Sequence, residues 1–321
     1  MRARPTSPER RTPGTPSLGP WAPGSLPSRH APWTPDAAIR YCEAMARSHY
    51  ENFPVVFGLM TRPQREALAA VYAFARTADD FADEPEFDGV REPLLDAWED
   101  RLRACFRGEA DHPVFVALDE VRRRHGLPER PFLDLLDAFR QDCREQRYAT
   151  FASVLDYCRR SANPVGRLVL HVLGLAREPL LGWSDRVCTA LQLTNFWQDL
   201  SVDVPRGRLY LPVEDLDRFG IRPEDLLGRE APPRFGELLR LETERTRALF
   251  DEGRPLCTAA VHPGCLYFGA VWAGGRAVLA LVEATGPAVL LRRPALSRAA
   301  LAAIVVGLLR GAGREGGWKR G

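Results

Sequence analysis

Several carboxylates crowd the end of one apolar segment. The run EALAAVYAFA, whose spacing predicts a helix, leads into Asp79, Asp80, Asp83 and Glu84. Negative side chains near a helix C-terminus face the negative end of the helix dipole, and like charges three or four residues apart repel each other. Pro85 pushes Glu84 out of the helical region, so the helix has to end close by. Something should therefore compensate for these carboxylates, and divalent cations would offset their repulsion.

A second polar stripe lies in the segment LQLTNFWQDLSVDVP. On a helix, four of its polar residues fall within roughly 80° of one face: Gln192, Asn195, Asp199 and Asp203. The same arithmetic puts four residues of the earlier segment within roughly 60°: Tyr72, Arg76, Asp79 and Asp83. Either stripe alone is more simply interpreted as a solvated helix edge. Because apolar residues that should be buried flank both stripes, we expect the two to face each other.

The residue types of the two stripes favour one kind of chemistry. Carboxylate and amide oxygens without Cys or His suit Mg²⁺ rather than zinc. The neighbouring guanidinium groups of Arg76, Arg206 and Arg208 suit phosphate oxygens. Aromatic residues beside the stripes could stabilise a carbocation. Together these features predict the ionisation of an allylic or cyclopropylcarbinyl diphosphate.

The elements that position these stripes are all predicted to be helices. Prolines and glycines separate the segments, and no credible strand or repeat of fixed period is present. Apolar residues recur at three and four positions in 36–50, 64–84, 90–107, 112–125, 131–145, 151–175, 184–203, 234–252, 264–284 and 296–310. We therefore expect one all-α domain of about ten helices over 36–310. A disordered Pro/Arg-rich tail over 1–35 and a basic tail over 311–321 should flank it.

Composition excludes several classes of protein. The chain of 321 residues has a net charge of +2. Its first 35 residues hold five arginines against one glutamate, a net charge of +4, which leaves about −2 for residues 36–321, so that part is unlike a nucleic-acid binder. Its seven cysteines form no CxxC pair, as is typical of reduced thiols in a cytoplasmic protein. The N-terminus lacks the apolar core of a signal peptide. The longest apolar run, at 299–309, is shorter than the roughly 20 residues that span a bilayer.

The C-terminal segment has two interpretations. Its Ala, Leu and Val residues with interspersed arginines could lie on an anionic membrane surface. Alternatively, it is a last core helix with a basic end. A hydrophobic substrate would favour peripheral contact with the inner face of the membrane.

The two stripes resemble the squalene/phytoene synthase family, which are head-to-head prenyl synthases of the all-α isoprenoid synthase fold. The family's first aspartate-rich motif matches YAFARTADDFAD, and its second matches QLTNFWQDLSVDVPRGRLYLP. Both motifs stand in the right order and at a suitable separation, and the resemblance covers roughly 36–285. It implies a single domain of helices around a central prenyl-diphosphate cavity.

The resemblance also implies roles for individual residues. Metal ligation is implied for Asp79, Asp80, Asp83, Asn195, Asp199 and Asp203. Contact with the diphosphate or an intermediate is implied for Arg76, Gln192, Arg208 and Tyr210. The segment YCRRSANPVG matches a family segment that lines the cavity, and it contributes Tyr157, Asn163 and Val165. Further substrate-binding candidates, each of which has an ordinary surface or core interpretation as well, are His49, Phe53 and Tyr72.

Three departures from the family pattern point to one branch. Asn52 replaces Ser, Asn163-Pro164 replaces Gly-Thr, and Gln198 replaces an Arg. These variants are similar to the hydroxysqualene synthases of bacterial hopanoid pathways, which convert presqualene diphosphate and water to hydroxysqualene. The amides could place a water near the cation. The pathway partners would be a presqualene diphosphate synthase, which joins two farnesyl diphosphates, and a flavoprotein hydroxysqualene dehydroxylase.

Other functions stay open from the sequence. One is an NADPH-dependent squalene synthase, since this family binds NADPH without a Rossmann unit. A second is a phytoene or dehydrosqualene-type synthase, and a third is a non-catalytic helical assembly factor of the same fold. A tyrosine that many members carry in a late helix aligns with Gly275, and Tyr267 is the candidate substitute.

Overall fold

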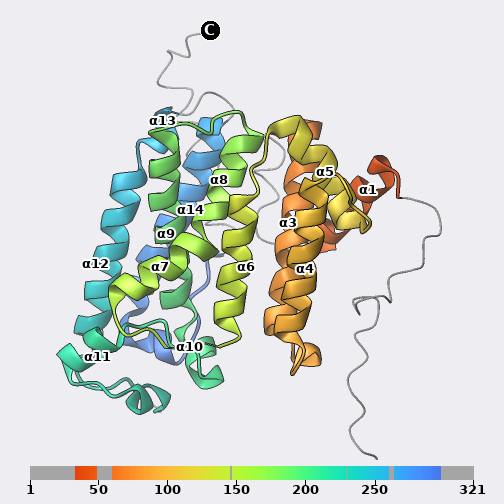
Figure 1. Ribbon diagram of the computed structural model, residues 1–321. Coiled ribbons are helices and arrows are strands. Elements are labelled where there is room, and N and C mark those ends of the chain that lie inside the picture. Colours follow the sequence, from red (N-terminus) through yellow and green to blue (C-terminus); the bar gives the residue numbers. More distant parts are fainter. Residues whose placement is uncertain (1–32, 49–59, 145–146, 229, 260–263, 298–321) are drawn as a thin grey trace, which may run out of the picture.

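Helices account for the regular structure of the described residues, apart from an isolated bridge between Arg147 and Leu209 (Figure 1). The computed structural model describes residues 33–48, 60–144, 147–228, 230–259 and 264–297. The predicted all-α fold is therefore confirmed for these residues. The candidates His49 and Phe53 and the predicted tail over 311–321 lie outside the described residues. Of the predicted tail over 1–35, only residues 33–35 are described.

The helices follow one another through short turns. The α-helices are α1 Pro35–Ser48, α3 Arg62–Asp83, α4 Arg91–Phe106, α5 Pro113–His125, α6 Arg130–Asp142, α7 Phe151–Ser161, α8 Asn163–Val172, α9 Leu180–Gln198, α10 Leu200–Asp203, α11 Val213–Phe219, α12 Phe235–Gly253, α13 Leu256–Ala259 and α14 Gly264–Thr285. Short 3₁₀ turns are η2 Pro85–Phe87, η3 Val204–Arg206, η4 Pro223–Leu227 and η5 Gly286–Leu290.

Two segments that were each expected to form one helix are broken. The predicted helix over 151–175 is divided into α7 and α8 at Ala162. Pro164 lies in the first turn of α8, where the missing N–H is tolerated, but it interrupts the hydrogen-bond ladder of a longer helix. The predicted helix over 184–203 is broken at Asp199, between α9 and α10.

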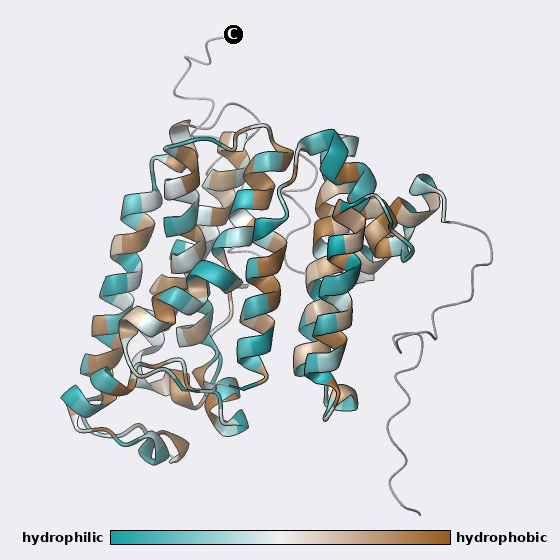
Figure 2. Ribbon diagram, viewed as in Figure 1, coloured by the Kyte–Doolittle hydropathy of each residue, from teal (hydrophilic) through white to brown (hydrophobic). Residues whose placement is uncertain are grey.

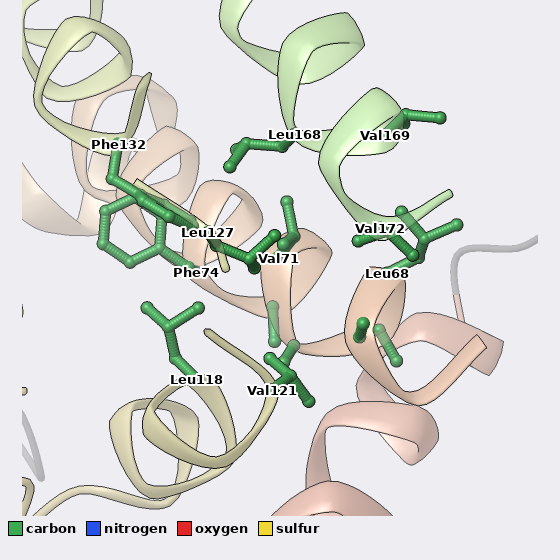
Figure 3. Packing of buried hydrophobic residues seen from close by; sticks show 14 of the residues in the cluster. Leu68, Val71, Phe74, Leu118, Val121, Leu127, Phe132, Leu168, Val169 and Val172 are labelled. Carbon is green, nitrogen blue, oxygen red and sulfur yellow. The ribbon is translucent and has the colours of Figure 1, made fainter. Parts of the chain in front are cut away.

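Two hydrophobic clusters hold the helices together, and the longer helices carry polar residues on the sides turned away from them (Figure 2). The first cluster joins α1, α3, α4, α5, α6 and α8. Figure 3 shows its residues from α3, α5, α6 and α8. At its centre the rings of Phe74 and Phe132 meet edge to face at 5.1 Å. The second joins α7, α9, α11, α12 and η5, where buried Trp197 donates a hydrogen bond to Thr246 at 2.9 Å. The first cluster fixes α3 and the second fixes α9.

One described segment, Gly264–Leu290, is long and apolar enough to cross a membrane by length and composition. Core helices of soluble proteins pass the same test, and α14 packs against both α9 and α12. The seven cysteines are all free thiols, as the sequence predicts.

Candidate functional site

The first stripe lies on the last two turns of α3, at the lower end of the helix in Figure 1. The helix ends at Asp83, and Glu84 has an extended backbone with φ −75° and ψ 134°. Pro85 follows directly and opens the turn η2, so the predicted helix end is confirmed. The carboxylates therefore do sit at the unfavourable end of the helix dipole.

Two arginines offset the charge of this stripe. Arg76 lies one turn before the carboxylates and pairs with Asp79 at 3.2 Å and with Asp80 at 2.5 Å. Arg208 comes from the far side of the second motif and forms a two-pronged contact with Asp83, in which Nη1 to Oδ2 is 3.2 Å. In the structure, the charge of these carboxylates is thus offset partly by Arg76 of α3 itself and partly by Arg208 of the second motif.

A third arginine caps the end of α3 and was missed in the sequence. Arg91, in the first turn of α4, donates to the carbonyl oxygens of Ala82 and Asp83. A guanidinium at the last carbonyls of a helix offsets the negative end of its dipole. The sequence could have indicated this contact, because the short segment between Pro85 and Arg91 brings the chain back toward the end of α3.

The second stripe keeps its line across the break in the helix. Asp199 has φ −98° and ψ 10°, outside helical geometry. Its N–H still donates to the Asn195 carbonyl at 2.9 Å, and its own carbonyl accepts from Asp203 at 2.9 Å. The three predicted ligands therefore remain stacked one turn apart. The carboxylate of Asp199 pairs with Arg293.

Two half-buried carboxylates at this end hold their protons more tightly than usual. Burial raises the pKa of Asp79 to about 6, against the opposing effect of Arg76. Burial also raises the pKa of Asp203 to about 6, and the charge of Asp199 adds to this effect. Hard oxygen donors that burial and mutual repulsion make unfavourable are a suitable set for a divalent cation, which would offset both effects.

Aromatic rings line the region between the carboxylates and α7. The rings of Phe196 and Tyr210 are parallel, with centroids 3.7 Å apart and an interplanar angle of 4°. Tyr157 lies 6.0 Å from Tyr210, and Tyr148 lies 5.4 Å from Tyr157. The structure therefore brings together the two predicted tyrosines and adds two rings to them.

A further carboxylate, Asp142, belongs to neither stripe. It is the last residue of α6, and it accepts a hydrogen bond of 3.0 Å from the Tyr157 hydroxyl. Burial raises its pKa to about 7, and the charges of Asp79 and Asp83 add to this effect, whereas the Tyr157 bond opposes it. The sequence carried the same signal as the first stripe, an acidic residue in the last turn of a helix, but as a single residue it was missed.

Comparison with known proteins identifies the family. The model of the squalene/phytoene synthase family matches residues 46–300. This chain belongs to the squalene/phytoene synthase family. It is 40% identical over 210 residues to a hydroxysqualene synthase of Rhodopseudomonas palustris, a match that covers 64% of this chain and 70% of the relative. It is 32% identical over 253 residues to a phytoene synthase of Arthrospira platensis, covering 74% and 81%.

Solved structures of the family share the fold. Squalene synthase HpnC from Alicyclobacillus acidocaldarius superposes with a TM-score of 0.75 and 41% sequence identity, covering 78% of this chain and 95% of that one. A dehydrosqualene synthase with a bound ligand superposes with a TM-score of 0.77 at 23% identity, covering 87% and 98%. The isoprenoid synthase fold that the sequence predicted is therefore confirmed.

The remaining predicted residues of this family member occupy different surroundings. Asn163 is buried, and its side-chain oxygen accepts from Thr189 at 2.9 Å, which ties α8 to α9. Val165 of α8 is 43% exposed. Tyr72 and Gln192 are half-buried on α3 and α9.

Two sequence-based expectations about amides and tyrosines need correction. Gln198 was expected to help place a water, but it is buried and donates to the Pro294 carbonyl at 2.7 Å. A Cβ at Gly275 would lie 2.4 Å from a methyl group of Leu191, so the late-helix tyrosine of other members does not fit there. Tyr267 is no evident substitute, because its ring packs against Phe268 rather than the aromatic group around Tyr210.

The donor set fits magnesium, although the described residues do not form a closed metal site. Within the described ranges, no three acidic, His or Cys side chains gather closely enough to hold an ion as they stand. The carboxylates instead hold arginines, at Asp79, Asp83 and Asp199. Guanidinium groups and divalent cations compete for the same oxygens, so the arrangement suits exchange of one for the other.

Proposed function

We propose that this protein binds Mg²⁺, ionises presqualene diphosphate and captures the resulting cation with water to give hydroxysqualene. The observation that carries the proposal is the junction of the two acidic motifs, where Arg208 reaches Asp83. The choice of branch is supported by the 40% identity to a hydroxysqualene synthase and the 41% identity to HpnC.

The carboxylate end of the bundle would hold the diphosphate. Magnesium, bound there, would neutralise the charge of the departing diphosphate. Its proposed ligands are Asp79, Asp80, Asp83, Asn195, Asp199 and Asp203. Arg76 and Arg208 would turn from the carboxylates to the phosphate oxygens, which their planar donors fit well. Tyr72 and Gln192, half-buried on the same two helices, would complete the contacts.

The aromatic group would stabilise the carbocation that remains. The faces of Phe196 and Tyr210 and the ring of Tyr157 lie beside the carboxylate end, where an electron-rich surface favours positive charge. Asp142 would hold the Tyr157 hydroxyl in place. Val165, exposed on α8, would contact the apolar chain.

A product analysis tests the reaction. Purified protein with Mg²⁺ would receive presqualene diphosphate or farnesyl diphosphate, each with and without NADPH, and extracts would be examined by gas chromatography and mass spectrometry. We expect hydroxysqualene from presqualene diphosphate, independent of NADPH. Squalene formed only with NADPH would contradict the water-capture step and indicate a one-enzyme squalene synthase.

A phytoene-type synthase is the second candidate. Its support is the 32% identity to a phytoene synthase over a longer stretch of the chain than the hydroxysqualene synthase match. Phytoene from geranylgeranyl diphosphate in the same assay would establish it. A non-catalytic assembly role is disfavoured because both motifs keep their carboxylates, and it would predict no binding of Mg²⁺ with a diphosphate analogue.

The proposed reaction places the protein between two others. A presqualene diphosphate synthase would supply its substrate, and a hydroxysqualene dehydroxylase would consume its product. Because both lipids are strongly apolar, we also propose contact with the inner face of the membrane.

A further inference from the structure

The chain after η5 crosses the second acidic motif. Val289 and Leu290 are buried in the cluster that contains Trp197 and Leu200, so the segment starts from a fixed point. Three residues of this chain then lie exposed before Pro294, which is buried again. The short stretch between the two buried points therefore runs over the junction of α9 and α10.

Gln198 supplies the second fixed point. It is the last residue of α9, it is 8% exposed, and its side-chain amide donates to the Pro294 carbonyl at 2.7 Å. A buried backbone carbonyl in a loop needs such a partner, because losing it leaves an unsatisfied polar group. This amide contact thus ties the C-terminal segment to the residue immediately before Asp199.

Arg293 is held directly beside this tie. It precedes Pro294, and its Nε and Nη2 atoms both contact the carboxylate of Asp199, with Nη2 to Oδ2 at 3.3 Å. The neighbouring Arg292 has no such contact among the described residues. Arg293 is 51% exposed at its side chain, so the ion pair by itself is weak and exchangeable. Its position must therefore come from the backbone that carries it.

We propose that Gln198 is a positioning residue, whose bond to Pro294 holds Arg293 over the second acidic motif. We also infer that the Arg293 guanidinium leaves Asp199 for a diphosphate oxygen when Mg²⁺ takes that carboxylate. This second step rests on the proposed function. The Gln198–Pro294 bond would thus hold at the second acidic motif a guanidinium that lies 94 residues after Asp199 in the chain.

A double-mutant cycle in metal-free protein tests, without any substrate, whether the Gln198–Pro294 bond positions Arg293. R293Q, Q198M, Q198E and the combined variants would be melted with EDTA present. Q198M is the deciding variant, because it removes the donor without adding charge, whereas Q198E also places a new carboxylate beside Asp199. We expect R293Q to lower the melting temperature by about 1–4 °C in the wild-type background and by less than half as much with Gln198 altered.

The control for this cycle is R292Q, an equal change of charge at the adjacent exposed residue, for which we expect no dependence on Gln198. Equal shifts for R293Q in both backgrounds, or the same behaviour for R292Q, would overturn the positioning role.

Calorimetry with Mg²⁺ and then with inorganic pyrophosphate tests the exchange. Without its guanidinium competitor, R293Q should bind Mg²⁺ about two- to five-fold more tightly than wild type. With Mg²⁺ present, it should bind pyrophosphate about ten-fold more weakly, because a charge-assisted hydrogen bond is missing. R292Q should match wild type in both titrations.

The outcomes separate the inference from the proposed function. If R293Q matches R292Q in both titrations, the exchange is overturned while the function stands. If wild type binds neither Mg²⁺ nor pyrophosphate, the proposed function fails and the exchange fails with it, whereas the metal-free cycle still decides whether Gln198 positions Arg293.

Discussion

The negative charges of the two acidic motifs are offset in different ways. The first lies on an unbroken helix, and Arg76 of the same helix pairs with Asp79 and Asp80 through contacts three and four residues apart. The second lies across a break, and its Asp199 pairs with Arg293, which lies 94 residues later in the chain, after helices α10 to α14. The first motif is therefore mostly a local structure, whereas the second is assembled by tertiary packing.

Asp83 is the exception in the first motif, because its partner Arg208 belongs to the second motif. Asp83 is thus the residue through which the two motifs contact each other, and changing it should impair the function of both. We expect D83N to lower the rate of pyrophosphate release by about 10²–10³-fold, since one charged group at a site of developing charge has an effect of that size. Stopped assays of released pyrophosphate would measure it.

E86Q is the matched control for D83N. Glu86 lies exposed in the turn that follows α3, so it shares the charge and the location but not the partner. Both variants should keep the helical circular dichroism of wild type. A D83N enzyme that turns over at the rate of E86Q would refute the metal assignment.

The dependence of the second motif on late packing can be tested at a glycine. Gly275 of α14 meets α9 and α12 closely, since a Cβ there would lie 2.4 Å from Leu191 and 2.7 Å from Phe250. We expect G275A to lower the free energy of unfolding by about 1–3 kcal/mol through overpacking. Urea denaturation would measure the change.

G274A provides a sharp control, because nothing lies within 4 Å of a Cβ at the preceding residue. Alanine is the better helix former by up to about 1 kcal/mol, so G274A should be neutral or stabilising. Equal destabilisation by the two substitutions would show that α14 does not pack closely against α9 at Gly275.

The same difference explains what the sequence could and could not predict. Helical periodicity and Pro85 were enough to place the first motif and its end, because those features act within a few residues. The partner of Asp199 was not predictable, since nothing local indicates that Arg293 returns to α9. The hydrogen bonds of Gln198 and Asn163 were not predictable for the same reason, since each amide bonds to a segment distant in the sequence.

The break at Asp199 shows a further limit. The polar stripe was predicted correctly although the helix was not continuous, because hydrogen bonds of 2.9 Å still connect Asn195, Asp199 and Asp203. Periodicity reports which side chains align, and it does not report small departures of the backbone.

Asp142 belongs to neither motif, so its titration tests the effect of the surrounding carboxylates without changing a residue of either motif. Its folded pKa of about 7 exceeds the ordinary value near 4 of an unfolded aspartate. Between pH 4 and pH 7, roughly, Asp142 is therefore protonated in the folded state but not in the unfolded state. The stability that this proton contributes is lost as the pH rises through about 7. D142N has no such proton to lose.

We expect the free energy of unfolding of wild type, relative to D142N, to fall by about 1–2 kcal/mol between pH 5.5 and pH 7.5 in EDTA. Urea denaturation at several pH values would measure it. A difference that is flat with pH, or that grows in favour of wild type as the pH rises, would contradict a raised pKa for the Asp142 carboxyl group in the folded state.

The smallest effect should come from the most local contact. Arg76 pairs with Asp79 and Asp80 along one helix, and its side chain is 31% exposed. Ion pairs of this kind stabilise a protein by about 0.3–0.5 kcal/mol. R76Q should therefore lower the free energy of unfolding of metal-free protein by no more than R62Q, which removes the pair with Glu66 at the start of the same helix.

R76Q should nevertheless weaken pyrophosphate binding in the presence of Mg²⁺, which R62Q should leave unchanged. Calorimetry on the two variants measures this contrast directly. A large loss of stability in R76Q alone would mean that the first motif also needs its arginine to hold α3 together, and the distinction between a local and an assembled motif would fail. A small loss with weakened binding would instead show that Arg76 stays beside the carboxylates to meet phosphate, because its ion pairs contribute too little to stability to account for its position.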